Sequence, residues 1–253
     1  MALGADPDFG TLPDDLIVVQ VGDLVHKGPD SVGAIALADR FLAAAPGRWI
    51  QLIGNHESQY LGGPEFWDDL IPLGAQHDLR HWVHTGQARL ALALETAEFG
   101  AVLVTHAGLT RWKWERMGRP AAAAQAAERL NTELIDHPER AFTPGVMLDH
   151  APNRDVGVTW AAPVEELVWS WDSEPLPFSQ IHGHASSYDW VRGGWRLQVD
   201  ERVSADAQAD PAIRHVTLTW PDARFIAEID PDYTTKGASV PLVPLVVAGE
   251  IAT

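Results

Sequence analysis

The sequence predicts an α/β fold in which two packed β-sheets are flanked by helices. Apolar runs rich in β-branched residues alternate with helical patterns over much of the chain, and the pattern then changes to β-hairpins. The chain has 253 residues, 46% of them hydrophobic, which is enough for one sizeable core. We therefore expect a single domain over residues 1–253, with a motif-bearing core at 16–190 and hairpins at 191–253 that complete the second sheet.

Four short apolar runs are expected to form strands. The first, LIVVQV at Leu16–Val21, has the continuous apolar character of a strand that is buried on both faces. The runs RWIQLIGN (48–55), GAVLVTHAG (100–108) and FSQIHGHAS (178–186) are expected to be strands that end at Gly54-Asn55, at His106, and near His182 and His184. Each of the four runs leads into a polar residue that could take part in chemistry.

Two segments are expected to be helices. The segment PDSVGAIALADRFLAAAPG (29–47) has an apolar residue at each helical turn, with Asp30 or Ser31 as the N-cap and Gly47 beyond the end. The Ala-rich segment PAAAAQAAERLNTELI (120–135) has strong helix propensity and places Pro120 in the first turn of a surface helix.

The C-terminal part is expected to form hairpins. The segment YDWVRGGWRLQV (188–199) has a Gly-Gly turn between two strand-like runs, and HVTLTWPDARFIAEID (215–230) has a Pro-Asp turn. The segment between them, SADAQADPA (204–212), is expected to be a hydrophilic loop.

Composition restricts the classes of function. A formal net charge of −17 disfavours binding to nucleic acid or to an anionic membrane. The absence of cysteine excludes disulfides, thiolate nucleophiles and iron–sulfur clusters, and leaves oxygen and imidazole ligands for a metal. The N-terminal residues have no signal-peptide pattern, and VPLVPLVVAG (240–249) is broken by two prolines. We therefore expect a soluble cytoplasmic protein with no nucleic-acid or membrane partner.

Side chains that can bind a metal follow all four predicted strands. They are Asp23, Asn55, His106, and either His182 or His184. Each of them alone is more typical of a turn or of a hydrogen-bonded core histidine. Together they predict a site for a divalent ion, because open α/β sheets form their sites at the carboxyl ends of strands. His56 follows Asn55 and, as an imidazole that is not a ligand, could protonate a leaving alkoxide.

Four motifs resemble those of calcineurin-like metallophosphoesterases, in the same order along the chain. They are GDLVHKGPDS (22–31), GNHE (54–57), VTHAGL (104–109) and IHGHAS (181–186), and the resemblance covers about Leu16 to Trp190. The branch that looks closest contains serine/threonine phosphatases and diadenosine tetraphosphatases. The resemblance implies a four-layer α-β-β-α sandwich, two divalent metal ions (manganese, iron or zinc), and a metal-activated water that attacks the phosphorus of a phosphorylated substrate.

The resemblance also implies roles for individual residues. Asp23 would bridge the two ions, and Asn55, His106 and His184 would complete the shell of one of them. His184 is preferred to His182 because Gly183-His184-Ala185 matches the Gly-His-small pattern of the family. His56 would be the general acid. Lys27 stands where the family usually has a phosphate-binding arginine, and it keeps the positive charge without the bidentate geometry.

Three departures from the family pattern leave alternatives open. No strand ending in Asp-x-His precedes Leu16, so an ion could be missing, and the start codon could be internal with a first strand lost upstream. His26 replaces the acidic residue that orients the general acid. The arginine often found before the last motif is absent, with Ala161 and Ala162 there and Arg154 as a substitute candidate. A non-catalytic member that binds phosphate or a partner is therefore the alternative, and a purely structural protein with incidental histidines is a third.

The eleven tryptophans leave the substrate open. Trp67, Trp82, Trp112 and Trp114 follow the motifs and would either line a cleft beside the metals or fill the core. A phosphoprotein, a nucleotide and a small phosphomonoester all remain candidate substrates.

Overall fold

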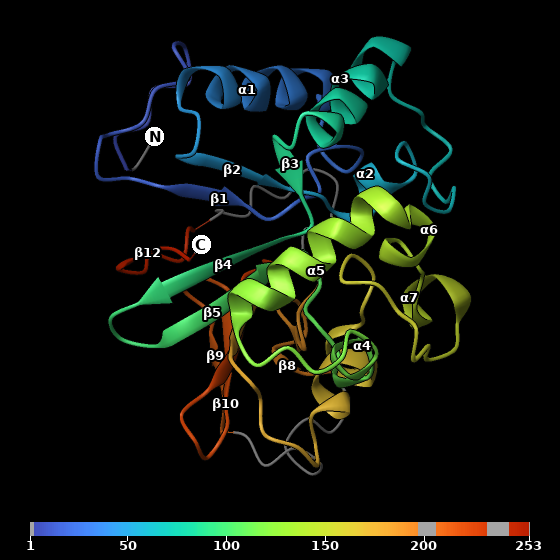
Figure 1. The fold of residues 1–253 in the computed structure, drawn as a ribbon, viewed down its shortest axis with the longest axis vertical. Helices are drawn as coiled ribbons and strands as arrows, with labels where there is room; N and C mark the ends of the chain where they lie inside the picture. The colour runs from blue at the N-terminus through green and yellow to red at the C-terminus, as the bar shows by residue number, and fades with distance from the viewer. Residues whose placement is uncertain (1–2, 197–205, 232–242, 253) are drawn as a thin grey trace.

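The computed structural model describes residues 3–196, 206–231 and 243–252 (Figure 1). The helices are α1 (Ser31–Ala44), α2 (Asn55–Ser58), α3 (Leu73–His84), α4 (Arg111–Arg116), α5 (Ala123–Asp136), α6 (Pro138–Ala141), α7 (Val146–Asp149) and a π-helical segment, η1 (Pro163–Val168). The strands are β1 (Val18–Gln20), β2 (Trp49–Leu52), β3 (Ala88–Arg89), β4 (Ala91–Thr96), β5 (Gly100–Thr105), β6 (Ser179–His182), β7 (Tyr188–Asp189), β8 (Gly194–Trp195), β9 (Asp206–Asp210), β10 (His215–Thr219), β11 (Phe225–Glu228) and β12 (Gly249–Ile251). None of the helices in these ranges is both long and apolar enough to cross a lipid bilayer.

The strands form two main sheets. The first has the order β1-β2-β3 with all pairs parallel, and Val19 is opposite Ile50 in its register. The second has the order β12-β4-β5-β6-β11-β10-β9. Its centre, β5-β6-β11, is parallel, whereas the outer pairs are antiparallel. Within each sheet, the carboxyl ends of the parallel strands therefore lie at one edge.

The two sheets pack face to face, with helices on their outer faces. Ile50 and Leu52 of β2 share an apolar cluster with Leu92, Val104 and Ile181 of the second sheet. Figure 1 shows α1 and α3 over the first sheet and α5 across β4 and β5. This arrangement confirms the predicted α/β class with two packed sheets between helices.

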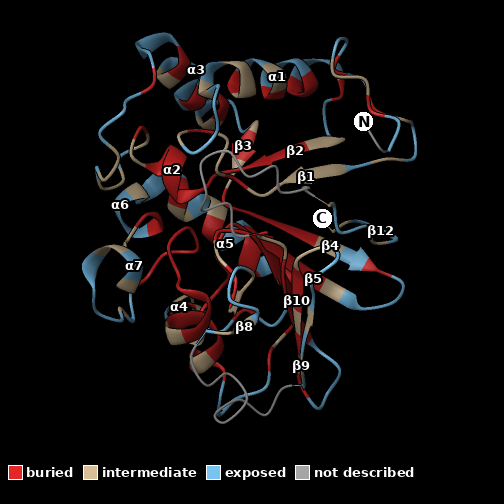
Figure 2. Ribbon diagram, turned by 180° about the vertical axis from the view of Figure 1, so that it is seen from behind, coloured by how far each residue is buried: buried red, intermediate tan, exposed pale blue. Residues whose placement is uncertain are grey.

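Helix α1 illustrates how local sequence sets an outer layer. The carboxylate of Asp30 accepts a hydrogen bond from the Gly33 N–H at 2.7 Å, so Asp30 is the N-cap of the two residues that the sequence allowed. Phe41 is buried on the inner face of the helix and stacks on Trp49 of β2. Figure 2 shows the exposed residues of α1 on the side that faces away from the sheet.

Strand β1 differs from the prediction in length and burial. It covers Val18–Gln20 instead of Leu16–Val21, and its residues are partly exposed instead of buried on both faces. The physical reason is its position at the end of the sheet order, where β2 covers one side of it.

The predicted hydrophilic loop at 204–212 is wrong within the described residues. Asp206–Asp210 is strand β9, paired antiparallel with β10. Ala207 and Ala209 point inward and contact an apolar cluster, while Asp206, Gln208 and Asp210 face out. The two-residue alternation of an edge strand is present here, but alanine makes its apolar face weak.

Two further boundaries are corrected. Pro120 is not in the first turn of α5, because that helix begins at Ala123 with Ala122 as its N-cap. The first predicted hairpin is β7–β8, and its turn consists of residues 190–193, so Gly194 lies in a strand and not in the turn. The remainder of that segment, 197–199, lies outside the described residues. The second hairpin, β10–β11, has the predicted Pro-Asp turn.

Candidate metal centre

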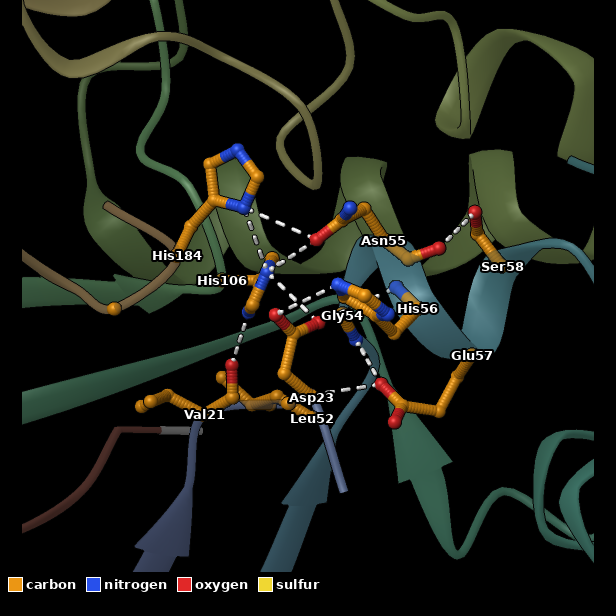
Figure 3. Close-up of polar contacts among 12 residues, drawn as sticks. Val21, Asp23, Leu52, Gly54, Asn55, His56, Glu57, Ser58, His106 and His184 are labelled. Carbon is orange, nitrogen blue, oxygen red and sulfur yellow. Dashed lines mark hydrogen bonds and ion pairs between the residues drawn. The ribbon is translucent and has the colours of Figure 1, made fainter. Parts of the chain in front are cut away.

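The ends of β1, β2, β5 and β6 bring four side chains to one point. Nε2 of His106 lies 3.1 Å from Oδ1 of Asn55, 3.2 Å from Nδ1 of His184 and 3.3 Å from Oδ1 of Asp23. Nδ1 of His184 lies 3.0 Å from Oδ1 of Asn55. Figure 3 shows the four side chains directed toward one another from separate segments. The residues that the sequence singled out as ligands therefore converge.

These four atoms suit a divalent cation. Ligand atoms about 2.1 Å from a metal, at right angles to each other, lie about 3.0 Å apart, close to the separations seen here. The oxygen and imidazole donors suit manganese, iron or zinc. Among the described residues, the cluster of Asp23, His106 and His184 is the one that groups three such charged or imidazole side chains.

A backbone carbonyl fixes the tautomer of His106. Its Nδ1 lies 2.6 Å from the carbonyl oxygen of Val21, so Nδ1–H donates and Nε2 presents its lone pair to the other ligands. Gly22 makes this close approach possible, because a Cβ there would lie 2.7 Å from Nδ1 of His106. Its φ of +99° is also readily adopted by glycine.

Glu57 shapes the loop that carries Asp23. Its Oε2 accepts hydrogen bonds from the N–H groups of Asp23 (2.9 Å) and Gly54 (2.8 Å). Its Oε1 accepts from Leu24 (2.7 Å) and Val25 (3.3 Å). Figure 3 shows the Glu57 carboxylate beside Asp23 and Gly54, and Glu57 is almost fully buried. Four loop N–H groups thus converge on one carboxylate, which holds the two strand ends together.

Several site residues have unusual backbone conformations. Asp23, His26 and His184 have φ values of +60°, +82° and +67°. Positive φ is disfavoured for residues with a side chain, and such strain is common at functional sites. The hydrogen bonds of the surrounding loops hold these conformations in place.

The electrostatics of the site favour a cation. Burial raises the pKa of Asp23 to about 7, with the positive charge of Lys27 acting in the opposite direction. Burial also lowers the pKa of His106 and lowers that of His184 well below its ordinary value. The histidines are therefore neutral at pH 7, the form in which imidazole binds metals, and a bound cation would stabilise the Asp23 carboxylate.

His56 lies beside the ligand cluster and not within it. Its Nε2 is 3.9 Å from Oδ2 of Asp23, and its N–H donates to Oδ1 of the same carboxylate at 3.2 Å. Burial and the nearby charge of Lys27 lower the pKa of His56. On its other side, Nδ1 of His56 lies 2.7 Å from Nδ1 of His26.

Aromatic rings surround this pair of histidines. Trp67 stacks on His26 with an interplanar angle of 3°, and it meets His56 edge-on at 5.1 Å between centroids. Phe66 meets His56 and also Trp160, which in turn faces His184. Of the tryptophans considered from the sequence, Trp67 is thus at the site. Trp82 is in the core, and Trp114 packs against Trp171.

The two predicted sources of positive charge differ in position. Lys27 is exposed, and its positive charge lowers the pKa of Asp23 and of three site histidines, His56, His106 and His184. The guanidinium of Arg154 lies over the Trp112 ring at 5.7 Å from its centroid. Ala161 and Ala162 are buried.

Several residues at the site were not identified from sequence. Glu57 belongs to the GNHE motif, and its burial next to four N–H groups depends on the contact between two strand ends. Tyr60, Phe66 and Trp160 come from segments whose approach to the site depends on the tertiary fold. Among these residues, only Tyr60 has a signal in the sequence, because its position four residues after His56 could have suggested that it lies near the site.

The fold and the four convergent side chains define a metallophosphoesterase-type protein. The profile of the calcineurin-like phosphoesterase family matches residues 7–201. The chain belongs to this family, for which metal-dependent phosphoester hydrolysis is implied. A search of curated proteins gives no match to the chain.

Proposed function

We propose that this chain hydrolyses phosphoesters with a divalent ion held by Asp23, Asn55, His106 and His184. The observation that carries the proposal is the convergence of four acceptor atoms from four strand ends on one point, at 3.0–3.3 Å along the measured pairs. An ion bound there would supply a Lewis acid that polarises the phosphoryl group and acidifies a water. Manganese is the first ion to test, and one ion matches the one cluster in the described residues.

The residues around the ion have separate tasks in this proposal. His56 acts as the general acid toward the leaving oxygen, because its Nε2 faces the Asp23 side of the cluster. Lys27 offers a positive charge to the phosphate from the exposed side of the loop. The substrate is a phosphorylated molecule, and the serine/threonine phosphatase or diadenosine tetraphosphatase branch stays a proposal, as does the cytoplasmic location.

One observation favours a second candidate, a member of the family that binds phosphate without turnover. His26 stands beside His56 at 2.7 Å, where a fixed negative charge would stabilise a protonated imidazole. Such a protein would still bind the metal and phosphate.

Metal content and turnover measured together distinguish these functions. The purified chain is loaded with Mn²⁺, its bound metal is quantified, and hydrolysis of 4-nitrophenyl phosphate is followed. Bound metal with turnover supports the hydrolase, and bound metal without turnover supports the binding protein. The absence of both bound metal and turnover would refute both functions. His56→Ala is expected to retain metal and to lose turnover of phenyl phosphate, whose leaving group needs an acid, whereas His106→Ala loses both metal and turnover. His77→Ala, an exposed histidine on α3, is the matched control.

A further inference from the structure

A row of three side chains extends from His56 away from the metal ligands. Nδ1 of His56 lies 2.7 Å from Nδ1 of His26, and Nε2 of His26 lies 2.6 Å from the hydroxyl of Tyr60. The Tyr60 oxygen in turn accepts a hydrogen bond from the Ile71 N–H at 3.2 Å. The row joins three parts of the chain: the loop after β1, helix α2 with the residues just beyond it, and the segment before α3.

The hydrogen bonds of Tyr60 set the direction of the whole row. The hydroxyl has one proton to donate, and the Ile71 N–H already occupies one of its lone pairs. Tyr60 is buried, and among the described residues the acceptor within reach of its O–H is Nε2 of His26. A buried hydroxyl left without an acceptor is costly, so the O–H donates to His26.

The remaining protons follow from this donation. If Nε2 of His26 accepts, a neutral His26 carries its proton on Nδ1 and donates it to Nδ1 of His56. A neutral His56 then carries its own proton on Nε2, which faces Oδ2 of Asp23 at 3.9 Å. Stacking of Trp67 on His26 keeps the His26 ring in place, and the backbone N–H of His26 donates to Ser31 Oγ at 2.9 Å, which fixes the loop that carries it.

We propose that Tyr60 and His26 are positioning residues that hold His56 in its Nε2–H tautomer, with the proton directed toward the reacting phosphoester. The catalytic consequence rests on the proposed function, whereas the tautomer itself is a property of the protein without metal. His26 thereby orients His56 by donating a hydrogen bond to it while remaining neutral.

The row also accounts for the proton in the reaction. As the bond from phosphorus to the leaving oxygen breaks, His56 gives its Nε2 proton to that oxygen and receives one at Nδ1 from His26. His26 receives one at Nε2 from Tyr60. Each imidazole gains one proton and loses one, and Tyr60 becomes a phenolate. A water then gives a proton to Nε2 of His56, and the protons move back along the same hydrogen bonds to Nδ1 of His26 and to the Tyr60 oxygen before the next turnover.

Nitrogen NMR of the histidine rings tests the tautomer directly. In the ¹⁵N-labelled, metal-free protein, we expect His56 protonated at Nε2 and His26 protonated at Nδ1. His26→Asn and His26→Asp form a matched pair, because both residues tolerate the positive φ at this position. The asparagine can donate to Nδ1 of His56 and keeps the proton on Nε2, whereas the aspartate can only accept and moves it to Nδ1. A wild-type His56 protonated at Nδ1, or the same tautomer in both variants, would overturn the proposal.

Kinetics with two leaving groups provides a second readout. For the Mn²⁺-loaded protein, Tyr60→Phe is expected to lower kcat for phenyl phosphate about tenfold or more, since general-acid assistance is weakened. For 4-nitrophenyl phosphate, whose leaving group needs less assistance, we expect less than about a twofold change, with KM unchanged for both. Tyr188→Phe, in the β7–β8 hairpin, is the control and should change neither. Equal losses of kcat on both substrates would contradict the proposed role of Tyr60 in supporting His56 as the general acid.

The two experiments distinguish a failure of the proposed function from a failure of the proposed orientation of His56. If no substrate is hydrolysed but the tautomers are as expected, the proposed function fails and the orientation of His56 stands. If hydrolysis occurs while His56 is protonated at Nδ1, the proposed function stands and the row is wrong.

Discussion

Replacement of Glu57 by glutamine is expected to destabilise the protein and weaken its metal site. Both carboxylate oxygens of Glu57 are used, Oε2 by the N–H groups of Asp23 and Gly54 and Oε1 by those of Leu24 and Val25. A glutamine amide keeps one oxygen and replaces the other with an NH₂ group. Two backbone N–H groups therefore lose their acceptor and face a donor.

The magnitude follows from the number of bonds lost. An unsatisfied donor in a partly buried loop costs about 1–2 kcal/mol, so two of them lower the free energy of unfolding by about 2–4 kcal/mol. The substitution removes no apolar volume, and Glu57 is 2% exposed, so cavity formation and surface effects contribute little. Because the loop positions Asp23, the Kd for Mn²⁺ is expected to rise about tenfold or more.

Urea unfolding followed by tryptophan fluorescence measures the change in stability, and calorimetric titration measures the change in Mn²⁺ affinity. Glu128→Gln, an exposed residue on α5, is the control and should stay within about 0.5 kcal/mol of the wild type. A loss below about 1 kcal/mol for Glu57→Gln, at an unchanged m-value, would refute the role assigned to this carboxylate.

Three other predictions test separate parts of the structure. Burial raises the pKa of Glu228 from 4.5 to about 7, so its contribution to stability is complete below pH 4.5 and is lost as the pH rises through 7. In urea unfolding, the free energy of unfolding of Glu228→Gln should therefore equal that of the wild type at pH 4 and exceed it at pH 8 by at most about 3 kcal/mol. Equal free energies at pH 8 would contradict this. Lys27→Ala should raise KM for 4-nitrophenyl phosphate about tenfold and leave the unfolding free energy unchanged, because the side chain is exposed; an unchanged KM would remove Lys27 from the phosphate site. Asp30→Ala should lower stability by about 1 kcal/mol through loss of the α1 cap without altering Mn²⁺ binding, and a change in metal affinity would count against a purely local role.

Sequence patterns predicted the architecture where local signals were strong. The strands leading to Asn55, His106 and His184 were recognisable because apolar runs end directly at polar residues, and parallel strands in a sheet end at the same edge. The cap of α1 was narrowed to two adjacent residues by the ordinary preference for aspartate or serine.

Other features depend on contacts between distant segments. Strand β1 was expected to be buried on both faces, but its burial depends on its place at the end of the sheet. Strand β9 was missed because alanine supplies only a weak apolar face. The contacts of Tyr60 and Glu57 with the loop after β1 join residues more than thirty positions apart, and no short motif reports such a distance.

The ion's position is the most direct test of the proposed site. A crystal of the chain soaked in Mn²⁺ and measured at an X-ray energy with manganese anomalous signal should show a peak about 2 Å from Oδ1 of Asp23, Oδ1 of Asn55, Nε2 of His106 and Nδ1 of His184. No peak among these atoms in fully soaked crystals, or a peak bound only by other residues, would contradict the metal centre and with it the proposed hydrolysis.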